Sequence, residues 1–220
     1  MKTKSEEVLE SFLTFNSLPF RKIEEVQEKG AYRPDYVVQV GNCEIIFEVK
    51  ELTEDEKFGT SPDPLHPHIK LSSRTLGQHV RRTIERSRKQ IQYGAEQGVP
   101  SILLIYNSLD PVFQDFGTDD PDFVAAMYGE YTLLLDRNTR ETSELFNGRN
   151  SSLQESKNTS FSAVGRLADR CRNINGDIVR ELTVTVFENV FAEVKLPYDQ
   201  LPKCIEVRRV EVSRDPLSFA

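Results

Sequence analysis

The chain has 220 residues, of which 38% are hydrophobic and 29% are charged, enough for one sizeable core but too few for two full domains. Its formal net charge of -7 excludes a protein that binds nucleic acid through an overall positive field, so any nucleic-acid site must be a local basic patch. The first ten residues lack the apolar segment of a signal peptide, no run of about 18 apolar residues occurs, and the three cysteines are widely spaced, so we expect a soluble cytoplasmic protein without membrane contacts.

The first fifty residues contain one helical pattern followed by three strand patterns. Ser5 precedes two glutamates and apolar residues at helical spacing, which predicts an N-cap and an amphipathic helix that ends near residues 16–19. Residues 20–27 alternate between apolar and polar side chains and predict a strand. Residues 35–50 contain two β-rich runs around a Gly41-Asn42 turn, which predicts a hairpin.

A long connection, a helix and a buried strand are predicted next. Residues 51–71 mix prolines, histidines and acids without periodicity and indicate a loop that is longer than usual. Apolar residues at helical spacing predict a long helix over residues 73–97 that packs on the sheet. The continuously apolar residues 101–106 predict a buried strand. The predicted order is therefore helix, strand, strand, strand, helix, strand.

The second half of the chain is predicted to be rich in strands. A short helix near residues 122–128 and a strand at residues 131–135 come first. Alternating or β-branched runs follow at residues 161–167, 178–187 and 205–212. We expect an α/β protein with a core in residues 1–110 and an α+β extension in residues 111–220 that packs on the core sheet or continues it.

Three charged residues of the predicted hairpin suggest a site for a divalent cation. Phosphodiester cleavage needs a hard cation, and two carboxylates hold such an ion when water and substrate oxygens complete its shell. Asp35 begins one arm of the hairpin and Glu48 lies near the end of the other, so antiparallel pairing puts both at one edge of the sheet. Lys50 lies two residues beyond Glu48 and points to the same face, where it can orient a water molecule or stabilise charge on phosphate.

These residues resemble the motif of the PD-(D/E)xK nuclease superfamily, which includes type II restriction enzymes, Holliday-junction resolvases and repair exonucleases. The matching residues are Pro34-Asp35 and Glu48-Val49-Lys50. The predicted order of elements over residues 5–107 is similar to the αβββαβ core of restriction-endonuclease-like proteins, a mixed central sheet flanked by helices. The resemblance implies that Asp35, Glu48 and the Val49 carbonyl bind Mg²⁺, or Mn²⁺ in its place, and that Lys50 is a catalytic base or an electrostatic helper.

The resemblance suggests two further catalytic residues. Members of the superfamily often add a glutamate from the first helix, and Glu6 borders the apolar stripe, whereas Glu7 and Glu10 point further toward solvent. Many members also place a glutamine at the position of Gln90, where it holds the water or a substrate phosphate. Each residue has a simpler interpretation as well. Glu6 favours the helix dipole, and Gln90 belongs to an ordinary solvated helix face.

The helix predicted over residues 73–97 is the one strongly basic segment of this acidic chain. Its basic residues are Arg74, Arg81, Arg82, Arg86, Arg88 and Lys89. We expect Arg82, Arg86 and Lys89 to contact a phosphate backbone. His66 and His68, in the preceding loop, are weaker candidates for contacts with substrate or a transition metal, because lone loop histidines usually make neither.

The sequence thus predicts a Mg²⁺-dependent endonuclease or exonuclease that acts on DNA in repair, restriction or phage defence, as a homodimer or with a partner subunit. Two alternatives stay open: a non-catalytic binding or scaffold protein on the same fold, and an RNA nuclease. Glu48 and Lys50 also fit a plain ion-paired strand end. A second E-x-K run, Glu193-Val194-Lys195, is interpreted as coincidental, because no Pro-Asp precedes it and no long helix follows.

Overall fold

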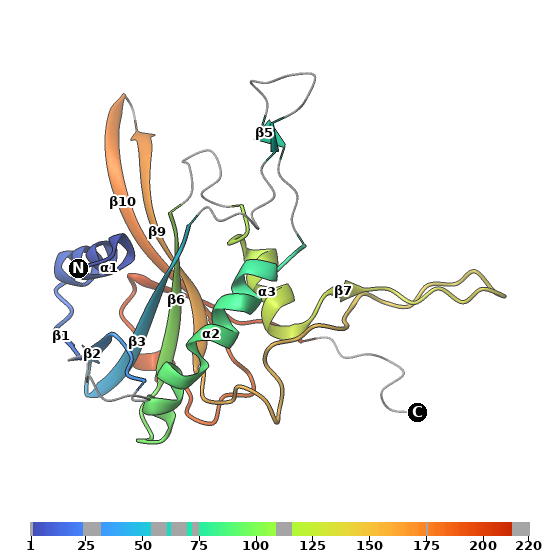
Figure 1. Cartoon of the computed structure of the whole chain (residues 1–220), viewed down its shortest axis with the longest axis horizontal. Coiled ribbons are helices and arrows are strands. Elements are labelled where there is room, and N and C mark those ends of the chain that lie inside the picture. The colour runs from blue at the N-terminus through green and yellow to red at the C-terminus, as the bar shows by residue number, and fades with distance from the viewer. Residues whose placement is uncertain are drawn as a thin grey trace.

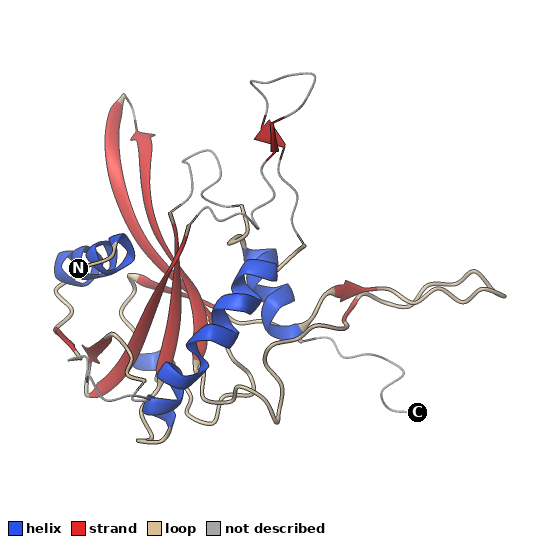
Figure 2. Cartoon of the chain, viewed as in Figure 1, coloured by secondary structure: helices blue, strands red, loops and turns tan. Residues whose placement is uncertain are grey.

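A mixed seven-stranded sheet with helices on both faces forms the centre of the protein, as the computed structural model shows (Figure 1 and Figure 2). The structure describes residues 2–23, 32–53, 61–62, 70–71, 75–108, 116–174 and 176–212. In their order across the sheet, the strands are β1 (Phe20–Lys22), β2 (Tyr36–Val40), β3 (Cys43–Leu52), β6 (Ser101–Asn107), β9 (Ala163–Ile174), β10 (Asp177–Glu188) and β11 (Ile205–Arg208). The predicted α/β class with a mixed sheet is therefore confirmed.

The remaining elements are helices and two short ladders outside the sheet. The helices are α1 (Lys4–Phe15), α2 (Gln78–Ala95), α3 (Asp120–Tyr128) and a 3-10 turn at Tyr198–Gln200. The ladders are β4 (Ser61–Pro62) with β5 (Lys70–Leu71), and β7 (Tyr131–Thr132) with β8 (Phe146–Asn147). None of the described helices is long and apolar enough to cross a membrane.

The pairing directions follow from the connections. β1, β2 and β3 pair antiparallel, and the β2–β3 turn contains Gly41 with a positive φ of 56°, a conformation that glycine adopts readily. β3 and β6 pair in parallel, and parallel neighbours need a crossover, which α2 supplies. β9 continues the sheet in parallel with β6, and β10 and β11 extend it further. The strands of the second half therefore lie in the same sheet as those of the first, while the boundary at residue 110 stays a prediction.

Two apolar cores lie on opposite faces of the sheet (Figure 2). On one face, α1 packs Leu9 and Phe12 against alternate strand residues that include Phe47. On the other face, α2 packs Ile84 against strand residues that include Leu103, and α3 joins this cluster. Residues 101–107 are buried throughout, which explains why β6 reads as a continuous apolar run.

The first helix begins two residues earlier than Ser5 predicts. Thr3 is the N-cap, because its hydroxyl accepts a hydrogen bond from the Glu6 N–H at 3.3 Å, and the Glu6 carboxylate accepts one from the Thr3 N–H at 2.8 Å. This reciprocal capping box needs a glutamate three residues after the cap, which Thr3 has. Ser5 is instead buried inside the first turn, where its N–H donates to the Glu51 carboxylate at 3.3 Å.

Several predicted boundaries move for physical reasons. The first strand is described only at 20–22, and residues 24–31 lie outside the described residues. The strand predicted at 131–135 forms a ladder only at Tyr131–Thr132, and Leu135 makes an isolated bridge to Thr142. β9 extends to Ile174, well past the predicted end at residue 167, because it pairs with β10 along its whole length in a hairpin that projects beyond the sheet (Figure 1). Beyond residue 167, the side chains of β9 pass from buried at Ala168 to exposed at Cys171 and Asn173, so no alternation of burial marks them in the sequence.

The packing of α2 on the sheet leaves no room for a side chain at Gly94. An added Cβ would lie 2.1 Å from the Ser101 Oγ and 2.8 Å from the Ile46 Cδ1. We expect Gly94→Ala to lower the free energy of unfolding by about 1–3 kcal/mol, although alanine favours a helix by about 1 kcal/mol over glycine. Urea unfolding measures the change. Arg88→Ala, at an exposed position of the same helix, serves as the control, and equal stabilities of the two variants would contradict this tight contact.

Candidate active site

The register of the β2–β3 hairpin places Asp35 beside Glu48. Tyr36, the first residue of β2, lies opposite Phe47, so the residue before it falls next to the residue after Phe47. Beyond Phe47, β3 continues to Leu52 with no strand on that side among the described residues. The Asp35 Oδ2 accepts a hydrogen bond from the Val49 N–H at 2.8 Å. The carboxylate thus occupies the place that a strand partner would take.

Glu48 and Lys50 point to the α2 side of the sheet, because Phe47 and Val49 face the α1 core. The Glu48 side chain is 1% exposed, and its Oε1 forms an ion pair with the Lys50 Nζ. Apart from this ion pair, neither Glu48 oxygen accepts a hydrogen bond within the described part of the chain. A buried carboxylate with an oxygen that has no donor is costly, so the site favours a ligand that supplies positive charge.

The two carboxylates destabilise each other's charge. Burial, and after it the negative charge of Asp35, raise the pKa of Glu48 to about 8, although Lys50 opposes the change. Burial also raises the pKa of Asp35, against the hydrogen bond from Val49 and the charge of Lys50, which lower it. One ammonium group therefore compensates two carboxylates only in part. A divalent cation would favour the ionised form of both.

Glu6 reaches the same place from α1. A cavity of about 320 Å³ is lined by Glu6, Lys22, Asp35, Val49 and Lys50, together with other residues from the start of the chain and the end of β3. The Glu6 Oε1 accepts a hydrogen bond from the Lys22 Nζ at 2.5 Å. Glu6 therefore has the structural role of capping α1 and also lies in the cavity with Asp35.

The other two glutamates of α1 have different surroundings. Glu10 accepts a hydrogen bond from the Tyr36 hydroxyl at 2.8 Å. Glu7 is exposed, and its Oε2 lies 3.9 Å from the Lys4 Nζ. Neither lines the cavity. Among these three glutamates, the structure brings only Glu6 to the cavity that Asp35 lines.

Gln90 lies on α2 at the level of Glu48. The close approach of Gly94 to Ile46 fixes how α2 lies along β3, and the crossover makes the helix run opposite to the strand. Two strand residues advance about 6.6 Å and a helix advances about 1.5 Å per residue, so Glu48 falls opposite the position four to five residues before Gly94. The Gln90 Oε1 is buried and accepts no hydrogen bond from the described residues. Glu48 on β3 and Gln90 on α2 thus share a level, and each has a buried oxygen that accepts no hydrogen bond from the described residues.

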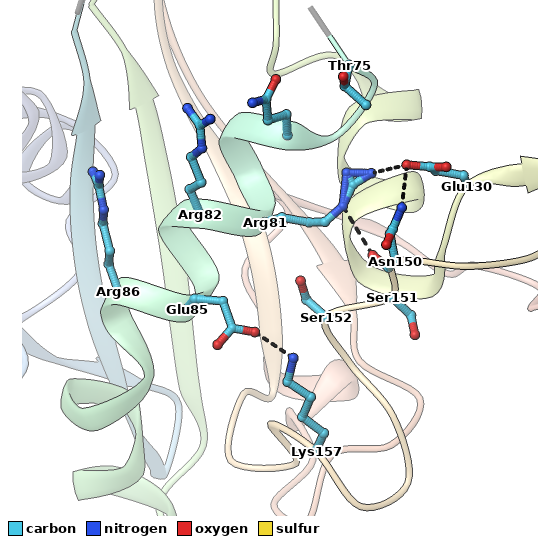
Figure 3. A pocket seen from close by; sticks show the side chains of 11 residues that line it. Thr75, Arg81, Arg82, Glu85, Arg86, Glu130, Asn150, Ser151, Ser152 and Lys157 are labelled. Carbon is cyan, nitrogen blue, oxygen red and sulfur yellow. Dashed lines mark hydrogen bonds and ion pairs between the residues drawn. The ribbon is translucent and has the colours of Figure 1, made fainter. Parts of the chain in front are cut away.

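The three basic residues predicted to contact phosphate divide into two groups. Arg82 and Arg86 line an open groove of about 700 Å³ beside α2 (Figure 3). The Lys89 Nζ lies 4.3 Å from the ring centroid of Tyr32, a cation–π contact. Tyr32 is 48% exposed and precedes Asp35 by three residues. Lys89 therefore contacts the segment that leads to Asp35 and does not line the groove.

Lys22 and Tyr32 are neighbours of the site that the sequence does not reveal. Lys22 lies opposite Tyr36 in the β1–β2 ladder, and this is how it reaches the Glu6 carboxylate. No two-residue turn motif between the two strands specifies that register from the sequence. Tyr32 contacts Lys89 only because its segment meets α2 in the folded chain.

The remaining sequence candidates lie elsewhere. Glu193 and Lys195 follow β10 in a loop and belong to no strand, as expected for a coincidental E-x-K run. His66, His68 and Arg74 lie outside the described residues.

The donor set suits a hard cation. Asp35 and Glu48 contribute carboxylate oxygens, and the Val49 carbonyl belongs to the residue between Glu48 and Lys50, so the available ligands are the oxygens that Mg²⁺ and Mn²⁺ prefer. No group of three or more His, Cys, Asp and Glu side chains suited to a metal is found among the described residues. An ion held here therefore needs water or substrate oxygens to complete its shell.

A plain ion pair at a strand end accounts for Glu48 and Lys50 but not for the rest of the site. It gives no reason for a second carboxylate, Asp35, next to the first, or for the Gln90 amide oxygen, which accepts no hydrogen bond from the described residues. No protein-family model, curated protein or solved structure matches the chain.

Proposed function

We propose that this protein is a metal-dependent nuclease of the PD-(D/E)xK type that hydrolyses phosphodiester bonds, with DNA as its substrate. One observation carries the proposal. The carboxylates of Asp35 and Glu48 lie side by side at an open strand edge, with one ammonium group, Lys50, against them. Two neighbouring carboxylates without enough positive charge destabilise the folded protein, but they form a suitable binding site for Mg²⁺.

Each residue of the site has a role in this chemistry. Asp35, Glu48 and the Val49 carbonyl would hold the ion, which when bound neutralises charge on phosphate and lowers the pKa of a water molecule. Lys50, whose ammonium group lies against Glu48, would direct that group at the attacking water or at the developing charge on phosphate. The Gln90 amide, opposite Glu48, holds the water or a phosphate oxygen, and Glu6 positions Lys22 at the cavity.

Purified protein incubated with linear duplex, circular duplex, single-stranded DNA and RNA tests the proposal. We expect cleavage of DNA with Mg²⁺ or Mn²⁺ and none with EDTA, because the carboxylate pair acts only with a cation. Cleavage of the circular substrate identifies an endonuclease, and cleavage of linear substrates alone identifies an exonuclease. Cleavage of RNA alone would make the protein an RNA nuclease instead. Binding without cleavage of any substrate, in any metal, would support a non-catalytic scaffold and overturn the proposal.

A further inference from the structure

The groove beside α2 has walls from both halves of the chain. One wall is α2, with Arg82, Glu85 and Arg86, and the other is the segment around Ser151 and Lys157 (Figure 3). Its volume is about 700 Å³ and it is open to solvent. The segment 149–157 belongs to the half of the chain for which the site described above gives no function.

Two of the four cations in the groove are already neutralised. The Arg81 guanidinium forms an ion pair with Glu130 at 3.2 Å and donates to the Asn150 carbonyl at 3.1 Å. The Lys157 Nζ lies 2.7 Å from the Glu85 Oε1, so this ion pair connects one wall to the other. These contacts hold the segment 149–157 against α2 and fix the shape of the groove.

The other two cations, Arg82 and Arg86, have no such partner among the residues that the structure describes. Within the described ranges, neither guanidinium forms an ion pair or a hydrogen bond, and both side chains project from α2 in the same direction, away from Glu85 and Lys157 (Figure 3). They are four residues apart, about 6 Å along the helix. In a protein with a net charge of -7, two adjacent uncompensated guanidinium groups indicate an anionic ligand.

The row of side chains on α2 connects the groove to the active site. Gln90 is at the level of Glu48, Arg86 lies one helical turn from it toward the start of α2, and Arg82 lies one turn beyond that. A ligand that reaches from the carboxylate pair into the groove therefore meets one cation at each turn of α2. A chain of regularly spaced phosphates matches this arrangement, whereas a single small anion would occupy only one position.

We propose that the groove binds the phosphodiester backbone of the nucleic-acid strand that leaves the Asp35 and Glu48 site, with Arg82 and Arg86 on successive phosphates and the segment 149–157 as the second wall. This inference rests on the proposed function, since it describes the path of the same substrate.

Removal of the two arginines tests the proposal through binding alone. We expect Arg82→Ala/Arg86→Ala to weaken binding of labelled DNA, measured by fluorescence anisotropy in EDTA, at least about tenfold. The slope of log affinity against log salt should fall by about 1.8 for duplex or about 1.4 for a single strand, because two phosphate contacts are lost. Arg82→Lys/Arg86→Lys should keep most of the slope. The control Arg137→Ala/Lys203→Ala removes two exposed cations that do not line the groove and should change neither quantity.

Changes of negative charge test the second wall. Ser151→Asp puts a carboxylate into the groove and should weaken binding, whereas Ser156→Asp, which lies outside it, should not. Glu85→Gln removes a carboxylate and releases Lys157 into the groove, while the contacts of Arg81 with Glu130 and Asn150 still hold the second wall, so we expect tighter binding and a steeper salt dependence. A gain in affinity is informative because a variant that merely damages the fold does not produce one.

The outcomes separate this inference from the proposed function. If wild-type protein binds and cuts DNA while the arginine and Ser151 variants, shown to be folded by thermal unfolding, bind as tightly as wild type, the groove assignment is wrong and the nuclease proposal stands. If wild-type protein neither binds nor cuts any nucleic acid, the nuclease proposal fails and the groove assignment fails with it.

Discussion

Asp35→Asn and Lys50→Ala are each expected to lower the rate of DNA cleavage with Mg²⁺ at least about a thousandfold, equivalent to about 4 kcal/mol of transition-state stabilisation. Asparagine keeps an oxygen that accepts the hydrogen bond from the Val49 N–H but loses the charge that would hold the cation. Alanine at position 50 removes the ammonium group from the Glu48 carboxylate. Initial rates on end-labelled DNA measure the loss, and circular dichroism with thermal unfolding shows whether the fold persists.

The second E-x-K run supplies a matched control for these substitutions. Glu193→Gln and Lys195→Ala change the same types of charge in a loop outside the site, so cleavage should continue at nearly the wild-type rate. The double variant Asp35→Asn/Lys50→Ala decides the assignment. Full activity in that variant would show that another part of the chain carries the chemistry.

Glu48→Gln is expected to stabilise the metal-free protein at alkaline pH while it abolishes cleavage. The pKa of Glu48 is about 8 in the folded protein, against 4.5 without burial, so the folded state holds a proton that the unfolded state has released. Between these two pKa values, the free energy of unfolding of the wild-type protein falls as pH rises, by up to about 1.4 kcal/mol per pH unit. The loss is complete above pH 8. Glutamine does not titrate, so the variant should not lose stability in this way. Near pH 9 its free energy of unfolding should exceed that of wild type by several kcal/mol.

Urea unfolding of both proteins in EDTA, from pH 4 to pH 9, measures this difference. The two stability profiles should agree at the acid end and separate as pH rises, because the other titrating groups are common to both proteins. Mn²⁺ should raise the stability of wild type at pH 8, since an ion that binds only the folded state stabilises it, and should have a much smaller effect on Glu48→Gln. Parallel pH profiles of the two proteins would show that folding does not raise the pKa of Glu48.

The meeting of Asp35 with Glu48 is predictable because every signal for it is local. The Gly41-Asn42 turn fixes the hairpin register, and the alternation of side chains then places Lys50 on the same face as Glu48. The order of elements through β6 is likewise encoded in short apolar patterns. These features need no knowledge of distant contacts.

The unpredicted features depend on contacts between distant segments or on a choice between equivalent residues. Thr3 and Ser5 are both good N-caps, and only Thr3 has a glutamate at the third helical position. Lys22 reaches the site through the register of β1 on β2, which no turn motif in the sequence predicts. The second wall of the groove is the segment around Lys157, which contacts α2 at Glu85, 72 residues earlier in the chain. No periodicity in either segment indicates that contact.

The hydrogen bond between Asp35 and the Val49 N–H also affects how the protein behaves toward other chains. β3 extends five residues beyond its pairing with β2, where no strand covers it among the described residues, and a strand edge of this kind is a template on which a foreign strand can add. The Asp35 carboxylate blocks this margin by occupying an amide that such a strand would use. A negative charge at the same point also repels acidic copies of the chain. The residue proposed to hold the cation therefore protects against aggregation as well, which is why asparagine, which still fills the position, is a better probe of catalysis than alanine.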